Sequence, residues 1–226
     1  LRSPLFWILA AAAGLRFAGL AWGLPAADGW DDDGFAPRNF LTALALTWKS
    51  GSFFTYPPLH ALVLALPSLP VAAWALAHAP SLGPHDVIMT ITQPVYMTIF
   101  AVLGRLISLA MSLGIIWTVG EMAKLVAGRR AGLFAAGATA LNFALTYYGQ
   151  VSNLDVPYLF WGLLSLLWFM RAVADEAPRR FWPAALFAAA AVATKDQAYA
   201  LFLLSLPLFL TAWFAGERWP RAHAAQ

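Results

Sequence analysis

The chain alternates long apolar stretches with short polar segments. About 20 apolar residues are needed for a helix to cross the hydrocarbon core of a bilayer. The candidate crossings are residues 4–24, 95–119, 131–148, 156–170, 182–194 and 198–215. The pattern predicts an all-α polytopic membrane protein, a single transmembrane core over residues 1–226 with about six transmembrane helices.

A further apolar run, residues 58–79, is interrupted by Pro67 and Pro70, which break the hydrogen-bond ladder of a helix. It can cross the membrane, re-enter it or lie in its interface. If it does not cross, nine of the 14 Lys and Arg residues fall on one side, as the positive-inside bias favours: Arg2, Lys124, Arg129, Arg130, Arg171, Arg179, Arg180, Arg218 and Arg221. This arrangement predicts a cytoplasmic N-terminus, a first outer loop over about 25–94 and a second over about 149–156.

The first outer loop combines a run of acids with an apolar face. Residues 34–50 carry apolar side chains at helical spacing, which predicts a helix lying in the membrane interface. Asp31, Asp32 and Asp33 precede it, and we expect them at the start of this helix, where the helix dipole keeps carboxylates ionised. Three carboxylates in a row beside an apolar span suggest action on a proton, a metal or a cationic centre, and the alternative is a solvated loop.

The stretch 182–194 has only 13 residues, about 20 Å of helix, which is shorter than the roughly 30 Å hydrocarbon core. A hairpin over 182–215 would therefore hold its apex, Lys195 and Asp196, below the outer surface, facing protein or a water-filled cavity. One long helix with the pair at mid-membrane is the alternative. It is disfavoured because it would carry Arg218 and Arg221 to the outer side.

Composition agrees with a membrane protein, since 61% of the residues are hydrophobic and 11% are charged. The net charge of +3 does not form a basic patch, so we expect no nucleic-acid partner. The chain has no cysteine, which excludes disulfides and thiolate metal sites. The first apolar stretch is too long for a signal-peptide core, and we expect it to be a retained anchor.

Four sequence pieces occur in an order that resembles a known superfamily. They are Asp31-Asp32 followed by Phe35; Tyr56-Pro57-Pro58-Leu59; Gly128-Arg129-Arg130-Ala131 through Tyr147 to Asp155-Val156-Pro157; and Thr194-Lys195. Over almost the whole chain they resemble the GT-C superfamily of membrane glycosyltransferases. The resemblance is closest to protein O-mannosyltransferase-like enzymes, glycosyltransferase family 39.

The resemblance implies a GT-C-like helical bundle in the bacterial inner membrane. Its enzyme would take part in building the cell envelope. Its reaction would be an inverting transfer of a sugar from a polyprenyl-phosphate donor to a lipid, glycan or protein hydroxyl on the outer face. Asp31 would be the base and Asp32 its partner, with Asp33 as a neighbour. Asp155 would be the second acid, supporting an acceptor, a metal or a basic ligand.

The cofactor is unknown from the sequence. Oxygen ligands suit magnesium or manganese, so Asp31, Asp32 and Asp155 are candidate metal ligands. Some GT-C enzymes need such an ion and others do not, which leaves metal dependence open.

The leaving phosphate needs cations to stabilise its developing charge. Arg105 is the first candidate, because an arginine ten residues into an apolar stretch costs on the order of 3 kcal/mol without an anionic partner. That partner is either the lipid phosphate or, in a structural ion pair, Asp31 or Asp155. Lys195 follows the same logic, with Asp196 as the structural alternative, and Arg38 is a weaker candidate.

The segment before Pro57 departs from relatives that transfer aminoarabinose. They carry Glu-Lys before the Pro-Pro pair, where this chain has Thr55-Tyr56. A lysine contact to phosphate is therefore lost, or is replaced by Tyr56 or His60. His60 on its own is more often an interfacial histidine than a ligand.

Two other classes of protein remain as alternatives. A transporter or flippase for an anionic lipid or lipid-linked sugar would show repeated halves, and the sequence shows no repeat. A non-catalytic membrane subunit would use its acidic residues only to pair with its basic residues.

GT-C enzymes usually carry further spans and often a soluble outer domain, so we also expect that the chain is a C-terminally truncated form. The sugar-transfer hypothesis predicts that Asp31 and Asp155 lie close together, with Arg105 and Lys195 lining the same cavity.

Overall fold

The computed structural model describes residues 3–25, 36–37, 39–47, 49 and 56–214. This described part is all-helical, as predicted, and its helices are α1 (Pro4–Ala18), α2 (Asn39–Thr47), α3 (Leu59–Ala77), α4 (Pro84–Ile91), α5 (Pro94–Ala140), α6 (Phe143–Tyr148), α7 (Asp155–Ala174), α8 (Phe181–Val192) and α9 (Ala200–Phe214), with short 3-10 helices η1 (Pro178–Arg180) and η2 (Asp196–Tyr199). By length and composition, α3, α5 and α7 can each cross a membrane. The protein is therefore a helical membrane protein.

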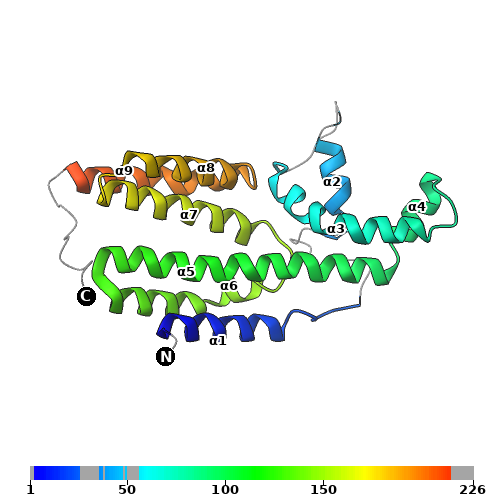
Figure 1. The fold of residues 1–226 in the computed structure, drawn as a ribbon, viewed down its shortest axis with the longest axis horizontal. Coiled ribbons are helices and arrows are strands. Elements are labelled where there is room, and N and C mark those ends of the chain that lie inside the picture. The colour runs from blue at the N-terminus through cyan, green and yellow to red at the C-terminus, as the bar shows by residue number, and fades with distance from the viewer. Residues whose placement is uncertain (1–2, 26–35, 38, 48, 50–55, 215–226) are drawn as a thin grey trace.

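The helices form an elongated molecule built along α5 (Figure 1). At one end of α5 the helices α1 and α7 pack against it, and α8 packs on α7. At the other end α3 packs on α5, joined by α2 and α4. Each end has its own apolar core. One core includes Ile115 and Ile116 of α5, and the other joins Leu64 of α3 to Phe100 of α5.

The helix α5 turns back on itself at Ala127 and Gly128, whose φ angles are −132° and 82°. The turn separates an arm over 94–126 from an arm over 129–140 and lies between the two spans that the sequence predicts there. The prediction that residues 131–148 form one continuous helix is wrong. The stretch is interrupted at residues 141–142, where the side chain of Asn142 accepts a hydrogen bond from the Leu145 amide at 2.9 Å and starts α6.

The two arms of α5 touch through glycines. A Cβ atom added at Gly132 would lie 2.7 Å from the carbonyl oxygen of Gly120, and one added at Gly120 would lie 3.1 Å from the Ala136 side chain. Small residues at such a contact let two helix backbones approach closely inside a membrane.

We expect replacement of Gly128 by alanine to destabilise the protein by about 1–3 kcal/mol, because its φ of 82° is strained for a residue with a Cβ atom. Gly137→Ala is the matched control, since Gly137 lies within a helical arm with nothing within 4 Å of an added Cβ atom. Thermal unfolding of the purified protein in detergent measures both changes. A Gly128→Ala protein as stable as the Gly137→Ala protein would contradict the strained turn.

The helix α3 corrects the expectation that Pro67 and Pro70 interrupt the run 58–79, since the helix is continuous through both prolines. The hydroxyl of Ser68 donates to the carbonyl of Leu64 at 2.8 Å, and α3 packs on α5 along this length. Hydroxyl side chains and neighbouring helices are the features that allow prolines inside membrane helices.

The interfacial helix is shorter than predicted. The helix α2 starts at Asn39, and its first turn contains no acidic residue. Asp31, Asp32 and Asp33, which we expected at the start of this helix, lie outside the described residues. By contrast, α8 is as short as predicted, with 12 residues, and the chain reverses through η2 into α9 (Figure 1), as the hairpin prediction requires.

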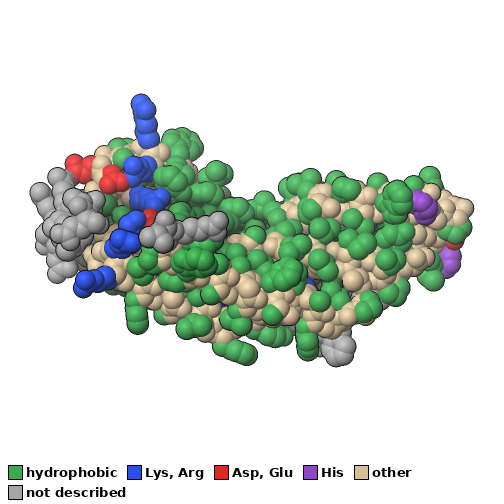
Figure 2. Space-filling model, turned by 60° about the horizontal axis from the view of Figure 1, so that its bottom comes forward, with side chains coloured by type: hydrophobic (Ala, Val, Ile, Leu, Met, Phe, Trp, Pro, Cys, Tyr) green, Lys and Arg blue, Asp and Glu red, His purple; other side chains and the backbone are tan. Residues whose placement is uncertain are grey.

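Positive charge gathers where α5 turns and where α7 ends. Figure 2 shows the lysine and arginine side chains clustered at this end of the molecule, beside an otherwise apolar surface. The described basic residues of these segments are Lys124, Arg129, Arg130, Arg171, Arg179 and Arg180. We refer to this part of the molecule as the basic end.

Candidate functional site

A partly buried ion pair joins α7 to the segment between α8 and η2. The Nζ atom of Lys195 lies 2.6 Å from Oδ1 of Asp155. The Lys195 side chain is 16% exposed and that of Asp155 is 41% exposed, so the carboxylate remains accessible from outside. The structural alternative, in which Lys195 pairs with Asp196, does not hold: Asp196 Oδ1 instead accepts from the Gln197 amide at 2.9 Å.

Two tyrosines complete the surroundings of the ammonium group. Lys195 Nζ lies 5.9 Å from the ring centre of Tyr56 and 5.4 Å from that of Tyr158. Aromatic faces attract a cation at this distance. Tyr56 reaches the site because α3 begins against the end of α8, where the Leu59 amide donates to the Ala193 carbonyl at 3.0 Å.

The buried side chain of Asn153 shapes the loop that presents Asp155. Its Oδ1 atom accepts hydrogen bonds from the amides of Asp155 at 2.8 Å and Val156 at 3.0 Å. Its Nδ2 atom donates to the carbonyls of Tyr148 at 2.6 Å and Val151 at 3.1 Å. Asn153 therefore satisfies amides at the start of α7. The first residue of that helix is Asp155, whose negative charge the helix dipole favours.

Burial alone would lower the pKa of Lys195, but the hydrogen bond and the negative charge of Asp155 outweigh it, and the two tyrosines add to them. The net effect raises the pKa of Lys195 above the usual value for a lysine. Lys195 is therefore a cation at neutral pH. The site therefore holds a partly buried ammonium group paired with a more exposed carboxylate.

Arg105 is also buried, but it is held by backbone carbonyls. Its Nη1 atom donates to the carbonyls of Leu20 and Trp22, both at 2.7 Å. These carbonyls belong to the turns that follow α1. Within the described residues, the hydrogen bonds of Arg105 thus join α1 to α5, and Asp155 pairs with Lys195 rather than with Arg105.

The remaining predicted site residues divide into two groups. His60 is buried in the first turn of α3, four residues beyond Tyr56. The predicted base Asp31, its partner Asp32, its neighbour Asp33 and the weaker phosphate ligand Arg38 lie outside the described residues. The closeness of Asp31 to Asp155 therefore stays a prediction.

Of the three candidate metal ligands, only Asp155 lies among the described residues. Within the described part of the chain, histidine and acidic residues form no group of three that could hold a metal ion. The metal site over Asp31, Asp32 and Asp155 therefore stays a prediction.

Sequence reasoning missed three residues that the structure makes prominent. Asn153 was recognisable as a polar residue just before a predicted span, where side chains often accept hydrogen bonds from the first helical amides. Tyr158 was recognisable as the residue three positions after Asp155, on the same face of a helix. Arg16, six residues before Trp22 in the first span, gave the same signal as Arg105: a lone charge in an apolar stretch.

Arg16 is fully buried where α1 meets the end of α5. Its guanidinium donates to the carbonyl of Ala12 at 3.2 Å and, through both Nη atoms, to that of Ala140 at 3.4 Å. Ala140 is the last residue of α5, so the positive charge lies against the negative end of the helix dipole. This contact makes Arg16 part of the packing between α1, α5 and α6.

Comparison of the chain with models of protein families, with curated proteins and with solved structures finds no match.

Proposed function

We propose that this chain is the transmembrane core of a glycosyltransferase that uses a polyprenyl-phosphate sugar. In this proposal the sugar passes to an acceptor hydroxyl on the outer face of a bacterial inner membrane. The observation that carries the proposal is the meeting of Tyr56, Asp155 and Lys195 in one site. Each belongs to a separate sequence piece on which the resemblance to GT-C enzymes rests.

The separation of these pieces along the chain gives their meeting its weight. About 100 residues separate Tyr56 from Asp155, and Lys195 lies 40 residues further on. Structural ion pairs also bring distant residues together, so the pair by itself supports many functions. Two aromatic rings around an ammonium beside an exposed carboxylate are more specific, because they form a polar site open to the surface.

The depth of the site in the membrane fits a lipid-linked donor. The helix α7 has 20 residues, about 30 Å, which matches the thickness of the hydrocarbon core. Arg171 in its last turn belongs to the basic end, and Asp155 begins the helix at the opposite end. A phosphate at the headgroup level of the lipid could therefore reach Lys195 without leaving the bilayer surface.

The charge distribution supplies the orientation in this proposal. The basic end would face the cytoplasm by the positive-inside rule. The pair of Asp155 and Lys195 would then face the outer compartment, as the sequence predicts for both. An outer site requires a donor already carried across the membrane, which is why a polyprenyl-phosphate sugar suits it better than a soluble nucleotide sugar.

The reaction is a single displacement at the anomeric carbon. The acceptor oxygen forms a bond to that carbon while the bond from the carbon to the phosphate oxygen breaks, and the phosphate leaves with the bonding electrons. The acceptor proton passes to a carboxylate, for which Asp31 is the proposed base. Lys195 stabilises the negative charge that develops on the phosphate, and Asp155 holds Lys195 in place.

The test is a transfer assay with the full chain in lipid vesicles. Polyprenyl phosphates carrying radiolabelled mannose or aminoarabinose are the probes, and a membrane extract supplies the acceptors. We expect conversion of one donor to polyprenyl phosphate with transfer of the label. Asp31→Asn should lower the rate by about 100-fold or more, because a general base contributes at least that factor.

Asp86→Asn is the matched control, since Asp86 lies in the same predicted outer loop and bonds only to the Ser81 hydroxyl at 2.6 Å among the described residues. Its protein should retain the wild-type rate. The proposal is wrong if the wild-type chain converts neither donor. It is equally wrong if the donor crosses the bilayer unchanged, because that result identifies a flippase.

A further inference from the structure

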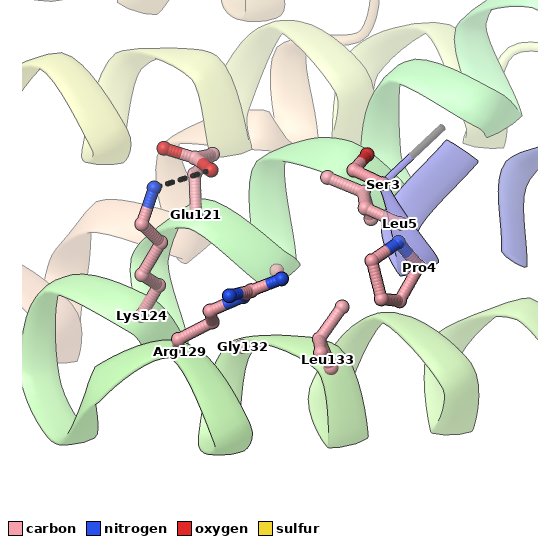
Figure 3. Close-up of a pocket in the computed structure, with 9 residues that line it drawn as sticks. Ser3, Pro4, Leu5, Glu121, Lys124, Arg129, Gly132 and Leu133 are labelled. Atoms are coloured by element: carbon pink, nitrogen blue, oxygen red, sulfur yellow. Dashed lines mark hydrogen bonds and ion pairs between the residues drawn. The ribbon is translucent and has the colours of Figure 1, made fainter. Parts of the chain in front are cut away.

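A second site lies at the basic end, and α7 connects it to the site of Lys195: Arg171 in the last turn of α7 pairs with Glu121 here, and Asp155 in its first turn pairs with Lys195. A cavity of about 200 Å³ opens between the start of α1 and the two arms of α5. Ser3 and Leu5 line it from the segment at the start of α1, Glu121 and Lys124 from the first arm, and Arg129 and Leu133 from the second (Figure 3). The proposed reaction uses none of these residues.

The cavity carries a net positive charge. Glu121 is already neutralised, since it pairs with Lys124 at 3.4 Å and with Arg171 at 3.1 Å. The guanidinium of Arg129 projects between Glu121 and Pro4 (Figure 3) and pairs with no carboxylate among the described residues. An arginine with open donors in a concave site binds phosphate oxygens well.

The start of α1 adds to this positive potential. Its first turn contains no acidic residue, and the Ser3 hydroxyl oxygen accepts a hydrogen bond from the Phe6 amide at 3.4 Å. The dipole of a helix favours an anion at the N-terminus. It acts here together with Arg129, which lies on the opposite wall of the cavity.

The remaining walls are apolar and continue onto the membrane-facing surface. Pro4, Leu5 and Leu133 line the cavity. Phe134, which follows Leu133, is 80% exposed, and Trp7, two residues after Leu5, is 63% exposed. Exposed aromatic side chains at the end of an apolar helix are typical of the membrane interface. A ligand here would therefore meet cations at one end and an apolar surface at the other.

We propose that this cavity binds the headgroup phosphate of an anionic membrane phospholipid. The phosphate lies between Arg129 and the start of α1, and an acyl chain follows Leu5 and Leu133. A lipid fits better than free phosphate, because much of the lining is apolar and the cavity opens where membrane helices end. The bound lipid would join α1 to both arms of α5 at the basic end.

The experiment is native mass spectrometry of the full chain in detergent, titrated with phosphatidylglycerol or phosphatidylcholine. We expect phosphatidylglycerol to bind more tightly, and Arg129→Gln to weaken it by about fivefold or more, the effect of one cation near an anionic lipid. Arg129→Lys should restore part of the affinity. Arg179→Gln is the control, because Arg179 is exposed at the same end but does not line the cavity.

Circular dichroism checks that each variant is folded, which is expected because Arg129 is exposed. Equal affinities for the two lipids would overturn the proposal, as would equal losses in the Arg129→Gln and Arg179→Gln proteins. Displacement of phosphatidylglycerol by millimolar inorganic phosphate would also overturn it, because the cavity would then be a site for free anions. None of these outcomes depends on sugar transfer, so the two proposals fail separately.

Discussion

Replacing Lys195 by glutamine is expected to reduce sugar transfer by about 100-fold or more while leaving the protein folded. The substitution removes the cation that meets the developing charge of the leaving phosphate, and loss of one such group costs a factor of about 100 to 1,000 in an enzyme. The cost in stability should be only about 1 kcal/mol, since Asp155 is 41% exposed and keeps the favourable start of α7. The transfer assay and thermal unfolding of the same preparations measure the two effects.

Three variants separate a role in transfer from a purely structural one. Asp196→Asn is the control, because Asp196 is exposed next to Lys195 and can keep its bond to the Gln197 amide. The double variant Asp155→Lys with Lys195→Asp retains an ion pair and should recover part of the stability, less the favourable helix-dipole contact of Asp155, without recovering transfer. Lys195→Arg should recover part of the transfer. If the exchanged pair transferred sugar at the wild-type rate, the role of Lys195 at the phosphate would be refuted.

Replacing Arg16 by alanine is expected to lower the free energy of unfolding by about 3 kcal/mol or more. The guanidinium is fully buried, so its removal leaves a cavity and takes donors away from the carbonyls of Ala12 and Ala140. Thermal unfolding in detergent gives the loss, and transfer by the protein that remains folded should be close to wild type.

The matched control is Arg179→Ala, which removes an exposed arginine and should change stability by less than about 0.5 kcal/mol. Arg16→Met fills most of the volume without donating hydrogen bonds, so it separates packing from hydrogen bonding. An Arg16→Ala protein that unfolds at the wild-type temperature would show that the buried guanidinium does not hold α1 to the end of α5.

The features predicted correctly from the sequence are those that depend on local rules. Helix boundaries near residue 155 and the short helix before Lys195 follow from the length of apolar runs. The turn at Gly128 follows from a glycine beside two arginines between apolar stretches. The all-helical membrane class follows from composition. The number of spans, the orientation and the GT-C bundle stay predictions.

The features that the sequence predicted wrongly depend on neighbours in space. Pro67 and Pro70 suggested a break because the packing of α3 on α5 is not visible in the sequence. The break at Asn142 was missed because a cap inside an apolar run has little effect on average hydropathy. Local propensity predicted a break in α3 that packing prevents, and it predicted continuity at Asn142, where one capping side chain starts a new helix.

The candidate site shows the same division. A lysine between two apolar stretches needs an anionic partner, and Lys195 has one in Asp155. Its choice of Asp155 over the adjacent Asp196 depends on how α8 packs against α7, which the sequence does not state. The guanidinium of Arg105 is instead hydrogen-bonded to backbone carbonyls. Such partners cannot be predicted from the positions of charged residues in the sequence.

The first arm of α5 is too long for the membrane that it enters. From residue 94 to the turn at 127 it has about 33 residues, or about 50 Å of helix, against a hydrocarbon core of about 30 Å. Fitting all of it inside would require a tilt of about 50°, beyond the range of about 0–40° seen for membrane helices. At an ordinary tilt of about 20°, with the turn held at one boundary, some ten residues emerge on the far side. Because α3 packs on α5 at that end, part of α3 would then extend beyond the hydrocarbon as well.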